Sequence, residues 1–315
     1  MLQTTQALVV VAPGRIGLQT VQIPPALPQE ATLRVKALSL NRGEVKRALT
    51  MSAAGARPGW DVAGVVEQAA ADGSGPPAGS RVVGVLSTGA WAQTIRVPVS
   101  QLAVLPAEVS FAQAATLPVA GLTALLALRK GGLLLGHKVL VDGASGGVGH
   151  FAVQIAAAAG AVVHAHVRHS GQAAALAPYC TGGVVVAPTL EAARASGPYH
   201  LVVDSIGGEA LGTALSMLTP GGACVTFGIS ESDTCTFNSA QFFRAGGTRL
   251  HGIMMFDEIH RGEPASECLA LLLRLIQQGR LVPQIAIEAP WSEAQAVAEK
   301  LMARAYAGKA VLHVD

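Results

Sequence analysis

Charge is scarce in this chain of 315 residues. Asp, Glu, Lys and Arg make up 13% of the sequence, and the formal net charge is +2. The sequence has no run of basic residues, so we expect no binding to nucleic acid, which needs a basic surface for the phosphates. Hydrophobic residues make up 50% of the chain, which excludes an intrinsically disordered protein. The length corresponds to about two domains.

Long apolar runs and paired cysteines are also missing. The longest mostly apolar stretch, residues 117–128, contains Pro118 and Gly121, and it is shorter than the roughly 20 residues that a membrane-spanning helix needs. The N-terminus lacks the basic segment of a secretory signal. The four cysteines form no Cys-x-x-Cys pair, which argues against structural zinc and against a disulfide framework. We therefore expect a cytoplasmic protein without a membrane segment.

The hydrophobic pattern changes along the chain. The first 110 residues contain short strand-like segments separated by Pro and Gly turns, which predicts a β-rich lobe. From Lys138, apolar strands alternate with helical segments, which is typical of a parallel sheet covered on both faces. The final stretch contains two helical segments, residues 264–278 and 292–307, and a closing strand, residues 310–314. Its mixed pattern suits a return to the first lobe.

These patterns predict an α/β fold with two domains. We expect a doubly wound parallel sheet at residues 118–253 and a discontinuous β-rich catalytic domain at residues 1–117 and 254–315. In the first lobe the predicted strands are residues 6–11, 31–40, 62–69, 81–86 and 92–98. In the second, strands are predicted at residues 139–142, 162–167, 184–186, 201–204 and 224–227, and helices at residues 148–160, 190–195, 209–218 and around Ala173.

The strongest local motif is Gly143-Ala-Ser-Gly-Gly-Val-Gly149. It follows a predicted strand ending at Asp142 and precedes an Ala-rich helix. The spacing Ala144-x-Gly146-x-x-Gly149 is the dinucleotide-binding fingerprint with Ala in place of the first Gly. Gly146 would let the backbone approach a pyrophosphate, and Gly149 would let the helix pack closely on the strand. The N–H groups of the helix N-terminus would face the phosphate charge.

The choice of dinucleotide depends on the end of the second strand of this domain. An acidic residue there binds the ribose hydroxyls of NAD, but no Asp or Glu occurs from Gly143 to Leu190. Arg168 can instead pair with a 2′-phosphate through two N–H groups, and Ser170 can add a hydroxyl. The alternative is an ordinary solvated arginine in a loop. The sequence therefore favours NADPH as the cofactor.

Five stretches together resemble one family. They are Val35–Glu44, Pro58–Val66, Leu117–Ala124, Gly143–Gly149 and Gly308–Leu312. In this combination the chain is similar to the medium-chain dehydrogenase/reductase superfamily, in its zinc-independent quinone oxidoreductase (zeta-crystallin-like) branch. The resemblance covers nearly the whole chain. It implies a GroES-like catalytic domain, a Rossmann domain that binds NADPH, and a homodimer joined through the sheets of the nucleotide domains.

The resemblance also assigns roles to individual positions. It places Asn41 near the nicotinamide ribose and Thr123 under the nicotinamide ring. Further residues would line the cofactor: Ser145, Gly146, Gly147 and Val148 at the pyrophosphate, Arg168 and Ser170 at the adenosine phosphate, and Phe227, Gly228, Ile253, Met254 and Met255 beside the nicotinamide.

Zinc ligands are missing at the positions where the zinc-dependent branch has them. Asn41, Trp60 and Val119 stand there, and of the matching residues only Asp61 could bind a metal, whereas catalytic zinc needs three protein ligands. We therefore expect no metal. The tyrosine that many quinone reductases carry after the asparagine is absent too, because residues 48–56 contain none.

A hydride donor without a metal suits an acceptor that is already electrophilic. The sequence therefore predicts an NADPH-dependent reductase whose small-molecule substrate is a quinone or an α,β-unsaturated carbonyl compound. Asn41, Lys46 and Asp61 are weak catalytic candidates, with Arg42 and Glu44 beside them. We assign no general acid and expect water to supply the proton. Two alternatives are a biosynthetic tailoring reductase acting on an imine or an activated ring intermediate, and an NADPH-binding protein with little turnover.

Overall fold

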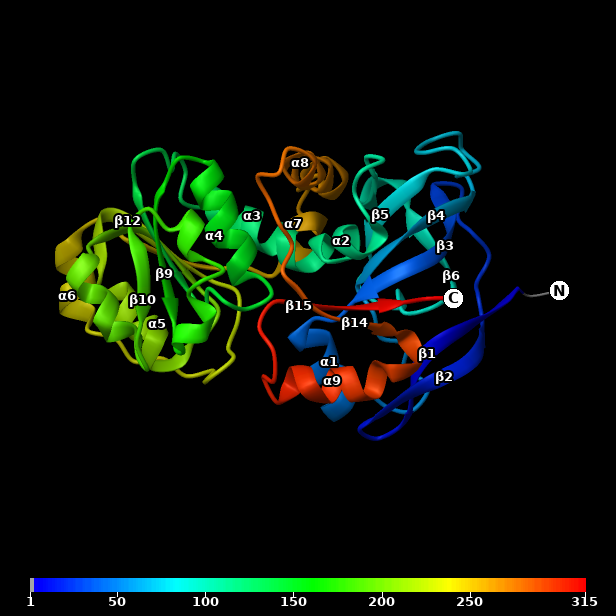
Figure 1. Ribbon diagram of the computed structural model, residues 1–315, viewed down its shortest axis with the longest axis horizontal. Helices are drawn as coiled ribbons and strands as arrows, with labels where there is room; N and C mark the ends of the chain where they lie inside the picture. The colour runs from blue at the N-terminus through cyan, green and yellow to red at the C-terminus, as the bar shows by residue number, and fades with distance from the viewer. Residues whose placement is uncertain (1–2) are drawn as a thin grey trace. The chain divides into compact units, whose positions relative to one another are not determined.

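The computed structural model describes residues 3–315, and the chain forms two compact units (Figure 1). Unit 1 contains the residues up to Leu122 together with Gly262–Asp315, and unit 2 is Thr123–Arg261. The domain boundaries predicted from the sequence fall a few residues before these.

Unit 1 is built on a largely antiparallel sheet with the strand order β14-β15-β3-β4-β5-β7, and β6 also pairs with β3. Strand β15 lies between β3, its antiparallel neighbour, and β14, its parallel neighbour. The C-terminal segment therefore completes the sheet that the N-terminal segment begins. The strands of this sheet are β3 (Glu30–Ser39), β4 (Asp61–Gln68), β5 (Arg81–Val85), β6 (Thr94–Pro98), β7 (Leu102–Val104), β14 (Ile285–Pro290) and β15 (Lys309–His313).

The remaining elements of unit 1 pack around this sheet. Strands β1 (Thr4–Ala12) and β2 (Arg15–Gln22) form an antiparallel pair. Alternate side chains of the strands, among them Leu33, Val35 and Leu312, are buried in one apolar core. The helices are α1 (Arg42–Thr50), α2 (Phe111–Ala115), a π-helical turn (Leu117–Gly121), α8 (Ala265–Gln277) and α9 (Ala294–Met302), with 3₁₀ turns at Val99–Gln101 and Trp291–Glu293.

Unit 2 is a parallel sheet of order β10-β9-β8-β11-β12-β13. Numbered from its own first strand, this is 3-2-1-4-5-6, the order of the dinucleotide-binding Rossmann fold. The strands are β8 (Lys138–Asp142), β9 (Val162–Val167), β10 (Gly183–Val186), β11 (Tyr199–Asp204), β12 (Leu218–Thr226) and β13 (Arg249–Gly252). The helices are α3 (Leu122–Arg129), which begins in unit 1, α4 (Gly149–Ala158), α5 (Gly208–Leu215), α6 (Ser239–Ala245) and α7 (Met255–His260), with 3₁₀ turns at Ser170–Gln172, Ala177–Tyr179 and Leu190–Ser196. The predicted α/β fold class is confirmed.

Three local predictions differ from the structure. The helix predicted around Ala173 is wrong, because that segment forms only 3₁₀ turns, with Gly171 and Pro178 as helix breakers. The helix at residues 190–195 is a 3₁₀ helix. Four strands were not predicted: β2, β7, β13 and β14. Most side chains of β2, β13 and β14 are at least partly exposed, so the apolar alternation is weak, and β7 has only three residues.

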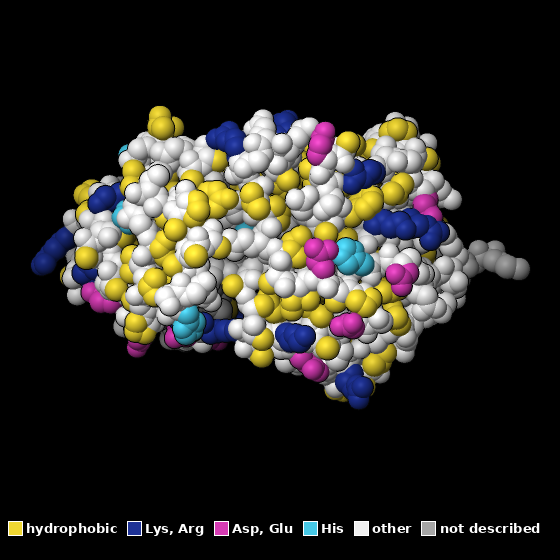
Figure 2. Space-filling view, viewed as in Figure 1, with side chains coloured by type: hydrophobic (Ala, Val, Ile, Leu, Met, Phe, Trp, Pro, Cys, Tyr) yellow, Lys and Arg dark blue, Asp and Glu magenta, His cyan; other side chains and the backbone are white. Residues whose placement is uncertain are grey.

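The surface shows the low charge of the sequence. On the face in Figure 2, Lys and Arg side chains are few and are interspersed with acidic and apolar ones. Within residues 3–315, no helix has the length and apolar character needed to cross a membrane.

Candidate functional site

The glycine-rich segment of unit 2 connects β8 to α4. Gly143 has a φ of 71°, and the carbonyl of Gly143 accepts a hydrogen bond from the Gly146 N–H at 2.9 Å, which closes a tight turn. A Cβ on Gly149 would lie 2.2 Å from the Gly143 oxygen and 2.7 Å from the Ala144 Cα. Helix α4 therefore begins in contact with the backbone of the turn, and only glycine fits there. This is the close packing that the fingerprint predicts.

The residues expected at the pyrophosphate lie on this turn. Ser145, Gly147 and Val148 are partly exposed, and Gly146 is exposed. Val148 is the N-cap of α4, and no side chain caps that end of the helix. The His150 N–H, in the first turn of α4, donates to the Gly146 carbonyl at 3.2 Å, so an anion here would bind to the other N–H groups of the turn and the helix start, as at other phosphate-binding helix N-termini.

The ends of β8 and β9 are joined by a buried pair of side chains. His166 Nδ1 lies 2.7 Å from Asp142 Oδ1, and His166 Nε2 lies 3.0 Å from the Ala187 carbonyl oxygen. Burial opposes the charged ring, but the hydrogen bond and charge of Asp142 raise the pKa of His166 above its usual value. The backbone carbonyl of His166 also accepts from the Ala144 N–H at 3.3 Å. This pair fixes the strand end that is followed by Arg168 and Ser170, both of which are exposed.

A second buried carboxylate organises the neighbouring strand ends. Asp204, at the end of β11, accepts hydrogen bonds from the Ile206 N–H at 3.1 Å, the Gly207 N–H at 3.2 Å and the Thr226 hydroxyl at 2.9 Å. Burial raises the pKa of Asp204 to about 6. The sequence analysis did not single out Asp204, although an acid at the end of an apolar strand could have marked it.

Several predicted cofactor residues lie just after the carboxyl ends of the parallel strands β12 and β13. The Phe227 N–H donates to the Asp204 carbonyl at 3.1 Å, and the Ile253 N–H donates to the Thr226 carbonyl at 2.9 Å. A Cβ on Gly228 would lie 2.8 Å from the Ser205 oxygen, so the chain passes too closely for a side chain. The other predicted residues differ in exposure: Ile253, Met255 and Thr123 are buried, and Met254 is exposed.

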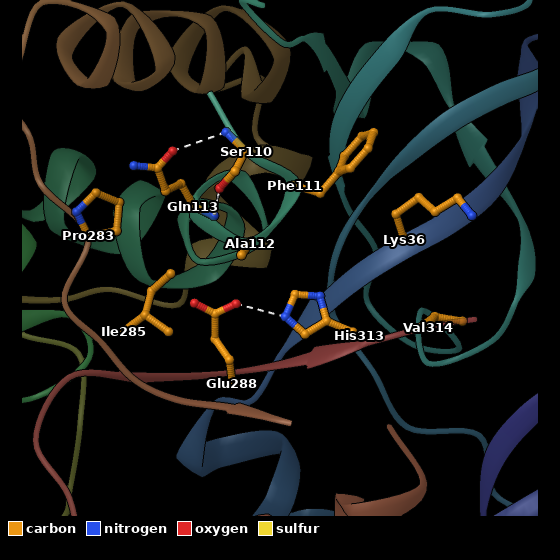
Figure 3. Close-up of a pocket in the computed structure, with 10 residues that line it drawn as sticks. All are labelled: Lys36, Ser110, Phe111, Ala112, Gln113, Pro283, Ile285, Glu288, His313 and Val314. Atoms are coloured by element: carbon orange, nitrogen blue, oxygen red, sulfur yellow. Dashed lines mark hydrogen bonds and ion pairs between the residues drawn. The ribbon is translucent and has the colours of Figure 1, made fainter. Parts of the chain in front are cut away.

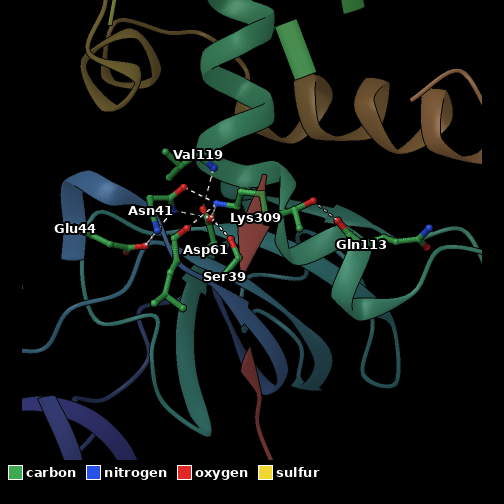
Figure 4. A network of polar contacts seen from close by, with 9 residues as sticks. Ser39, Asn41, Glu44, Asp61, Gln113, Val119 and Lys309 are labelled. Atoms are coloured by element: carbon green, nitrogen blue, oxygen red, sulfur yellow. Dashed lines mark hydrogen bonds and ion pairs between the residues drawn. The ribbon is translucent and has the colours of Figure 1, made fainter. Parts of the chain in front are cut away.

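Unit 1 contains a group of polar side chains, all buried except the partly buried Asn41, that we call the Asp61 cluster: Ser39, Asn41, Glu44, Asp61 and Lys309 (Figure 4). Asp61 Oδ2 accepts hydrogen bonds from the Ser39 hydroxyl at 2.6 Å and from Asn41 Nδ2 at 2.7 Å. Asp61 Oδ1 accepts from the Val119 N–H at 2.8 Å. Both oxygens of this fully buried carboxylate are therefore satisfied.

Lys309 is the cation of the cluster. Its Nζ donates to the Leu40 carbonyl at 3.0 Å and to Asn41 Oδ1 at 2.6 Å, and it lies 3.4 Å from Asp61 Oδ2. Lys309 is only 2% exposed. The sequence analysis noted the Gly308–Leu312 stretch but gave Lys309 no role. A charged residue at the start of a buried apolar strand was the signal that could have identified it.

Helix α1 and a tight turn supply the rest of the cluster. Asn41 is the N-cap of α1, and Glu44 at the third helical position completes a capping box with it. Gly59 has a φ of 112°, and a Cβ there would lie 2.4 Å from the Trp91 nitrogen, so glycine is needed for the turn that leads into Asp61. Lys46 lies on the exposed face of α1, so the structure does not bring this predicted candidate into the cluster.

Glu44 is buried, at 2% exposure. Burial, and then the charge of Asp61, raise the pKa of Glu44 well above its usual value, and Lys309 and the hydrogen bonds from Asn41 oppose this only in part. Glu44 lines a small pocket of about 90 Å³ together with residues that include Arg57, Trp60 and Thr88.

A wider hollow of about 810 Å³ lies elsewhere on unit 1 (Figure 3). It is open, and its lining includes Lys36, Gln113 and an ion pair between His313 and Glu288, whose Nε2 and Oε2 atoms are 2.7 Å apart. These side chains are not part of the Asp61 cluster.

Two of the residues compared with zinc ligands in the sequence analysis have other partners. Asn41 and Asp61 are engaged in the hydrogen bonds described above. In the chain from residue 3 onward, no three His, Cys, Asp or Glu side chains are grouped so as to hold a metal ion.

Two family models match the chain. The model of the alcohol dehydrogenase GroES-like domain matches residues 27–107, and the model of zinc-binding dehydrogenases matches residues 147–273. The first match lies in the β-rich part of unit 1. The second covers most of unit 2 and extends into the part of unit 1 that begins at Gly262.

Curated relatives agree with these models. The chain is 34% identical over 265 residues to the spectinabilin polyketide synthase system protein NorB of Streptomyces orinoci, which is 82% of this chain and 12% of that protein. It is 42% identical over 170 residues to a chloroplast envelope quinone oxidoreductase homolog of Arabidopsis thaliana, 48% of this chain and 51% of that protein. It is 33% identical over 150 residues to a 2-methylene-furan-3-one reductase of Solanum lycopersicum, 43% and 39% of the two chains. The chain thus spans about half or less of the length of these relatives.

Solved structures share the fold along nearly the whole chain. The CurK enoyl reductase superimposes with a TM-score of 0.84 at 25% identity, covering 99% of this chain and 100% of that one. A mycobacterial protein solved in complex with NADPH superimposes with a TM-score of 0.84 at 24% identity, covering 98% and 100%.

Proposed function

Because this chain belongs to the zinc-independent quinone oxidoreductase family of the medium-chain dehydrogenase/reductase superfamily, we propose that it is an NADPH-dependent reductase. Its substrate is a quinone or an α,β-unsaturated carbonyl compound. The observation that carries the proposal is the edge of the unit 2 sheet, where the glycine-rich turn and the uncapped start of α4 lie beside the strand end that leads to Arg168.

The residues at this edge fit a phosphorylated dinucleotide. In this proposal Ser145, Gly146, Gly147 and Val148 hold the pyrophosphate through backbone N–H groups. Arg168 and Ser170, both exposed at the end of β9, bind the 2′-phosphate. Phe227, Gly228, Ile253, Met254 and Met255 lie beside the nicotinamide, with Thr123 at the same end of the cofactor. Bound NADPH supplies the hydride.

The expected substrate follows from the lack of suitable metal ligands among the residues of the proposed site. Without a metal to polarise a simple ketone, hydride transfer needs an acceptor that is already electron-poor, such as a conjugated enone or a quinone. The names of two relatives, a 2-methylene-furan-3-one reductase and an enoyl reductase, describe that kind of acceptor for those proteins. A more specific candidate is enoyl reduction in a biosynthetic pathway. It is favoured by the likeness to a protein named as an enoyl reductase and by the match to NorB, a polyketide synthase system protein, over 82% of this chain.

The cofactor proposal is tested with Arg168→Ala. Loss of a charge-assisted, two-pronged contact costs about 1.5–3 kcal/mol, so NADPH should bind about ten- to a hundredfold more weakly. NADH affinity should change little. Fluorescence titration with both cofactors measures this, and Arg194→Ala, at an exposed arginine of the same unit, is the matched control. An equal loss for both cofactors would contradict the phosphate role of Arg168.

The reductase activity is tested with a panel of quinones, cyclic enones and enoyl thioesters while NADPH oxidation is followed. Turnover of at least one conjugated acceptor, with none of saturated ketones, is the expected result. Tight NADPH binding without turnover of any member would favour a binding protein instead.

A homodimer is part of the proposal. In the sheet of unit 2, β13 pairs with β12 and lies at the end of the strand order, and Leu250 on it is 45% exposed. Pairing of two β13 strands would cover this edge. Light scattering during gel filtration should then give twice the mass of the 32.0 kDa chain.

A further inference from the structure

His166 and Asp142 form a buried pair at the strand ends from which the expected phosphate-binding residues follow. Their exposed fractions are 5% and 3%, and His166 Nδ1 lies 2.7 Å from Asp142 Oδ1. On the other side of the ring, His166 Nε2 lies 3.0 Å from the Ala187 carbonyl oxygen. The imidazole ring therefore bridges the last residue of β8 and the residue that follows β10.

The two partners of the ring determine how many protons the pair holds. A carbonyl oxygen only accepts hydrogen bonds, so the contact with Ala187 requires an N–H on Nε2. A carboxylate also only accepts, so the contact with Asp142 requires a second N–H on Nδ1, and the ring is then an imidazolium. The remaining arrangement, a neutral ring beside a protonated Asp142, contains the same number of protons. The pair thus holds one proton more than a neutral histidine and a carboxylate would.

A second histidine of β9 shows that this proton depends on Asp142. His164 lies two residues earlier, on the same face of the strand, and is also buried. Within residues 3–315 neither of its ring nitrogens has a hydrogen-bond partner, and burial, together with the charge of Lys138, lowers the pKa of His164. Burial acts in the same direction on His166, but the hydrogen bond and the charge of Asp142 outweigh it and raise the pKa of His166.

Other ionisable side chains lie on the elements around β9. Strands β8 and β10 and helix α4 pack against β9, and β11 lies beyond β8. Strand β10 has no titratable side chain. The groups on the remaining elements and at the end of β9 are Lys138 and Asp142 on β8, His150 on α4, Arg168 after β9 and Asp204 on β11. Of these, Asp142 is hydrogen-bonded to the ring, and the charge of Arg168 opposes the charge of the imidazolium.

The pair connects the two segments that are expected to hold the phosphates of the dinucleotide. Asp142 directly precedes Gly143, where the glycine-rich turn begins, and His166 stands two residues before Arg168. One backbone hydrogen bond joins the same segments, from the Ala144 N–H to the His166 carbonyl at 3.3 Å. That bond is long, so the charge-assisted contact at 2.7 Å is the stronger connection. The proton of the pair therefore helps to fix the turn against the end of β9.

We propose that His166 is a positioning residue of the cofactor site and that the proton it shares with Asp142 is needed for tight binding of the dinucleotide. This inference rests on the proposed NADPH-dependent function. With the proton present, the ring holds both of its partners and the pair has no net charge. Without it, a neutral ring can donate to only one partner.

Loss of the proton also leaves a buried negative charge on Asp142, beside the turn that holds the pyrophosphate. Asp142 Oδ2 has no hydrogen-bond partner among the described residues, so no other group takes over from the ring. A looser turn and a second negative charge both weaken binding of a pyrophosphate. Because NADPH and NADH both contain a pyrophosphate, the pair acts on both cofactors, whereas Arg168 distinguishes them.

The test is the pH dependence of cofactor binding. Fluorescence titrations with NADPH and with NADH run from about pH 6 to about pH 9, a range that starts near the usual histidine pKa of about 6.5. Because the pKa of His166 is raised, its proton is present at the low end and is lost as pH rises through that pKa. The Kd of both cofactors should then rise at least about fivefold, the lower end of ordinary coupling between linked events. Ionisation of a phosphate, with a pKa of about 6, has the opposite effect on NADPH.

The variant His166→Gln keeps a hydrogen-bond donor but has no proton that titrates. At about pH 6 it should bind both cofactors about fivefold more weakly than the wild type, and its Kd should not change further up to about pH 9. A purely structural role would instead weaken binding by one factor at every pH and keep the wild-type pH dependence. The matched control is His313→Gln, because His313 also pairs with a carboxylate, Glu288 at 2.7 Å, but at an exposed position of unit 1. It should behave as the wild type does.

Linkage between the proton and the cofactor provides a second measurement. If the proton strengthens NADPH binding about fivefold, bound NADPH must raise the pKa of His166 by the logarithm of that factor, about 0.7. NMR spectra of protein with ¹⁵N-labelled histidine measure this pKa with and without NADPH. The chain has nine histidines, and the signal of His166 is the one that disappears in His166→Gln.

The results separate this inference from the proposed function. A wild type that binds neither cofactor at any pH overturns the proposed function, and this inference with it. A wild type whose Kd is the same at both ends of the pH range, or a His166→Gln variant that keeps the wild-type pH dependence, overturns only the role of His166. If His166→Gln does not fold, the NMR titration of the wild type decides: the inference is overturned when no histidine has a higher pKa in the NADPH complex.

Discussion

Replacing Lys309 by methionine should strongly destabilise unit 1. Lys309 Nζ contacts the Leu40 carbonyl, Asn41 Oδ1 and Asp61 Oδ2. Methionine is apolar and similar in length, so the substitution removes the charge and leaves little empty space. Asp61, which is fully buried, then keeps its negative charge without a cation. Breaking a buried ion pair in this way costs about 3–5 kcal/mol.

The expected loss is large enough to measure by calorimetry. For a domain of about 150–250 residues, 1 kcal/mol corresponds to about 2–4 °C in Tm, so the transition that contains unit 1 should move down by about 6–20 °C. Calorimetry is preferred because the two units can unfold in separate transitions. Lys300→Met, at an exposed position on α9, is the control and should change Tm by less than about 2 °C, since surface substitutions usually cost under 0.5 kcal/mol.

A double variant tests the physical reason. Asp61→Asn combined with Lys309→Met removes both charges. The double variant should therefore lose less free energy of unfolding than the sum of the losses in the two single variants. If Lys309→Met costs less than about 1 kcal/mol, or if the two losses simply add, the ion pair does not hold the cluster together.

Two further predictions concern unit 2. Gly149→Ala places a Cβ 2.2 Å from the Gly143 oxygen, so α4 must move away from the turn. We therefore expect NADPH affinity, measured by fluorescence titration, to fall at least tenfold. Unchanged affinity would show that the close approach is not needed for binding. The folded-state pKa of Asp204 is raised from 3.8 to about 6, so the stability that its protonated form contributes is present below about pH 4 and lost as pH rises to about 6. The shift corresponds to about 3 kcal/mol. Asp204→Asn should flatten urea-derived stability over that range, and the same slope in both proteins would exclude Asp204 as its source.

The sequence was most informative where the chemistry is local. The turn from Gly143 to Gly149 and the strand before it lie within a dozen residues, and their spacing alone predicts the close packing seen at Gly149. The parallel sheet was predictable for the same reason, because each of its central strands is a short apolar run.

The Asp61 cluster could not be assembled in that way. Asn41 and Asp61 come from the N-terminal part of the chain, and Lys309 is 248 residues beyond Asp61. They meet only because β15 pairs with β3, beside β4. The sequence analysis named Asn41 and Asp61 separately, and it ranked Lys46 with them since nothing local shows that α1 turns Lys46 outward and Glu44 inward.

The position of β15 in the sheet also has a consequence for biosynthesis. Unit 2 is one continuous segment, Thr123–Arg261, whereas unit 1 needs Gly262–Asp315. As the chain leaves the ribosome, the nucleotide-binding sheet can fold while the Asp61 carboxylate still waits for its ammonium partner. Until residue 309 emerges, β3 lacks its neighbour β15 and Asp61 lacks its ammonium partner. Newly made chains should therefore pass through an intermediate with a finished second unit and an unfinished first.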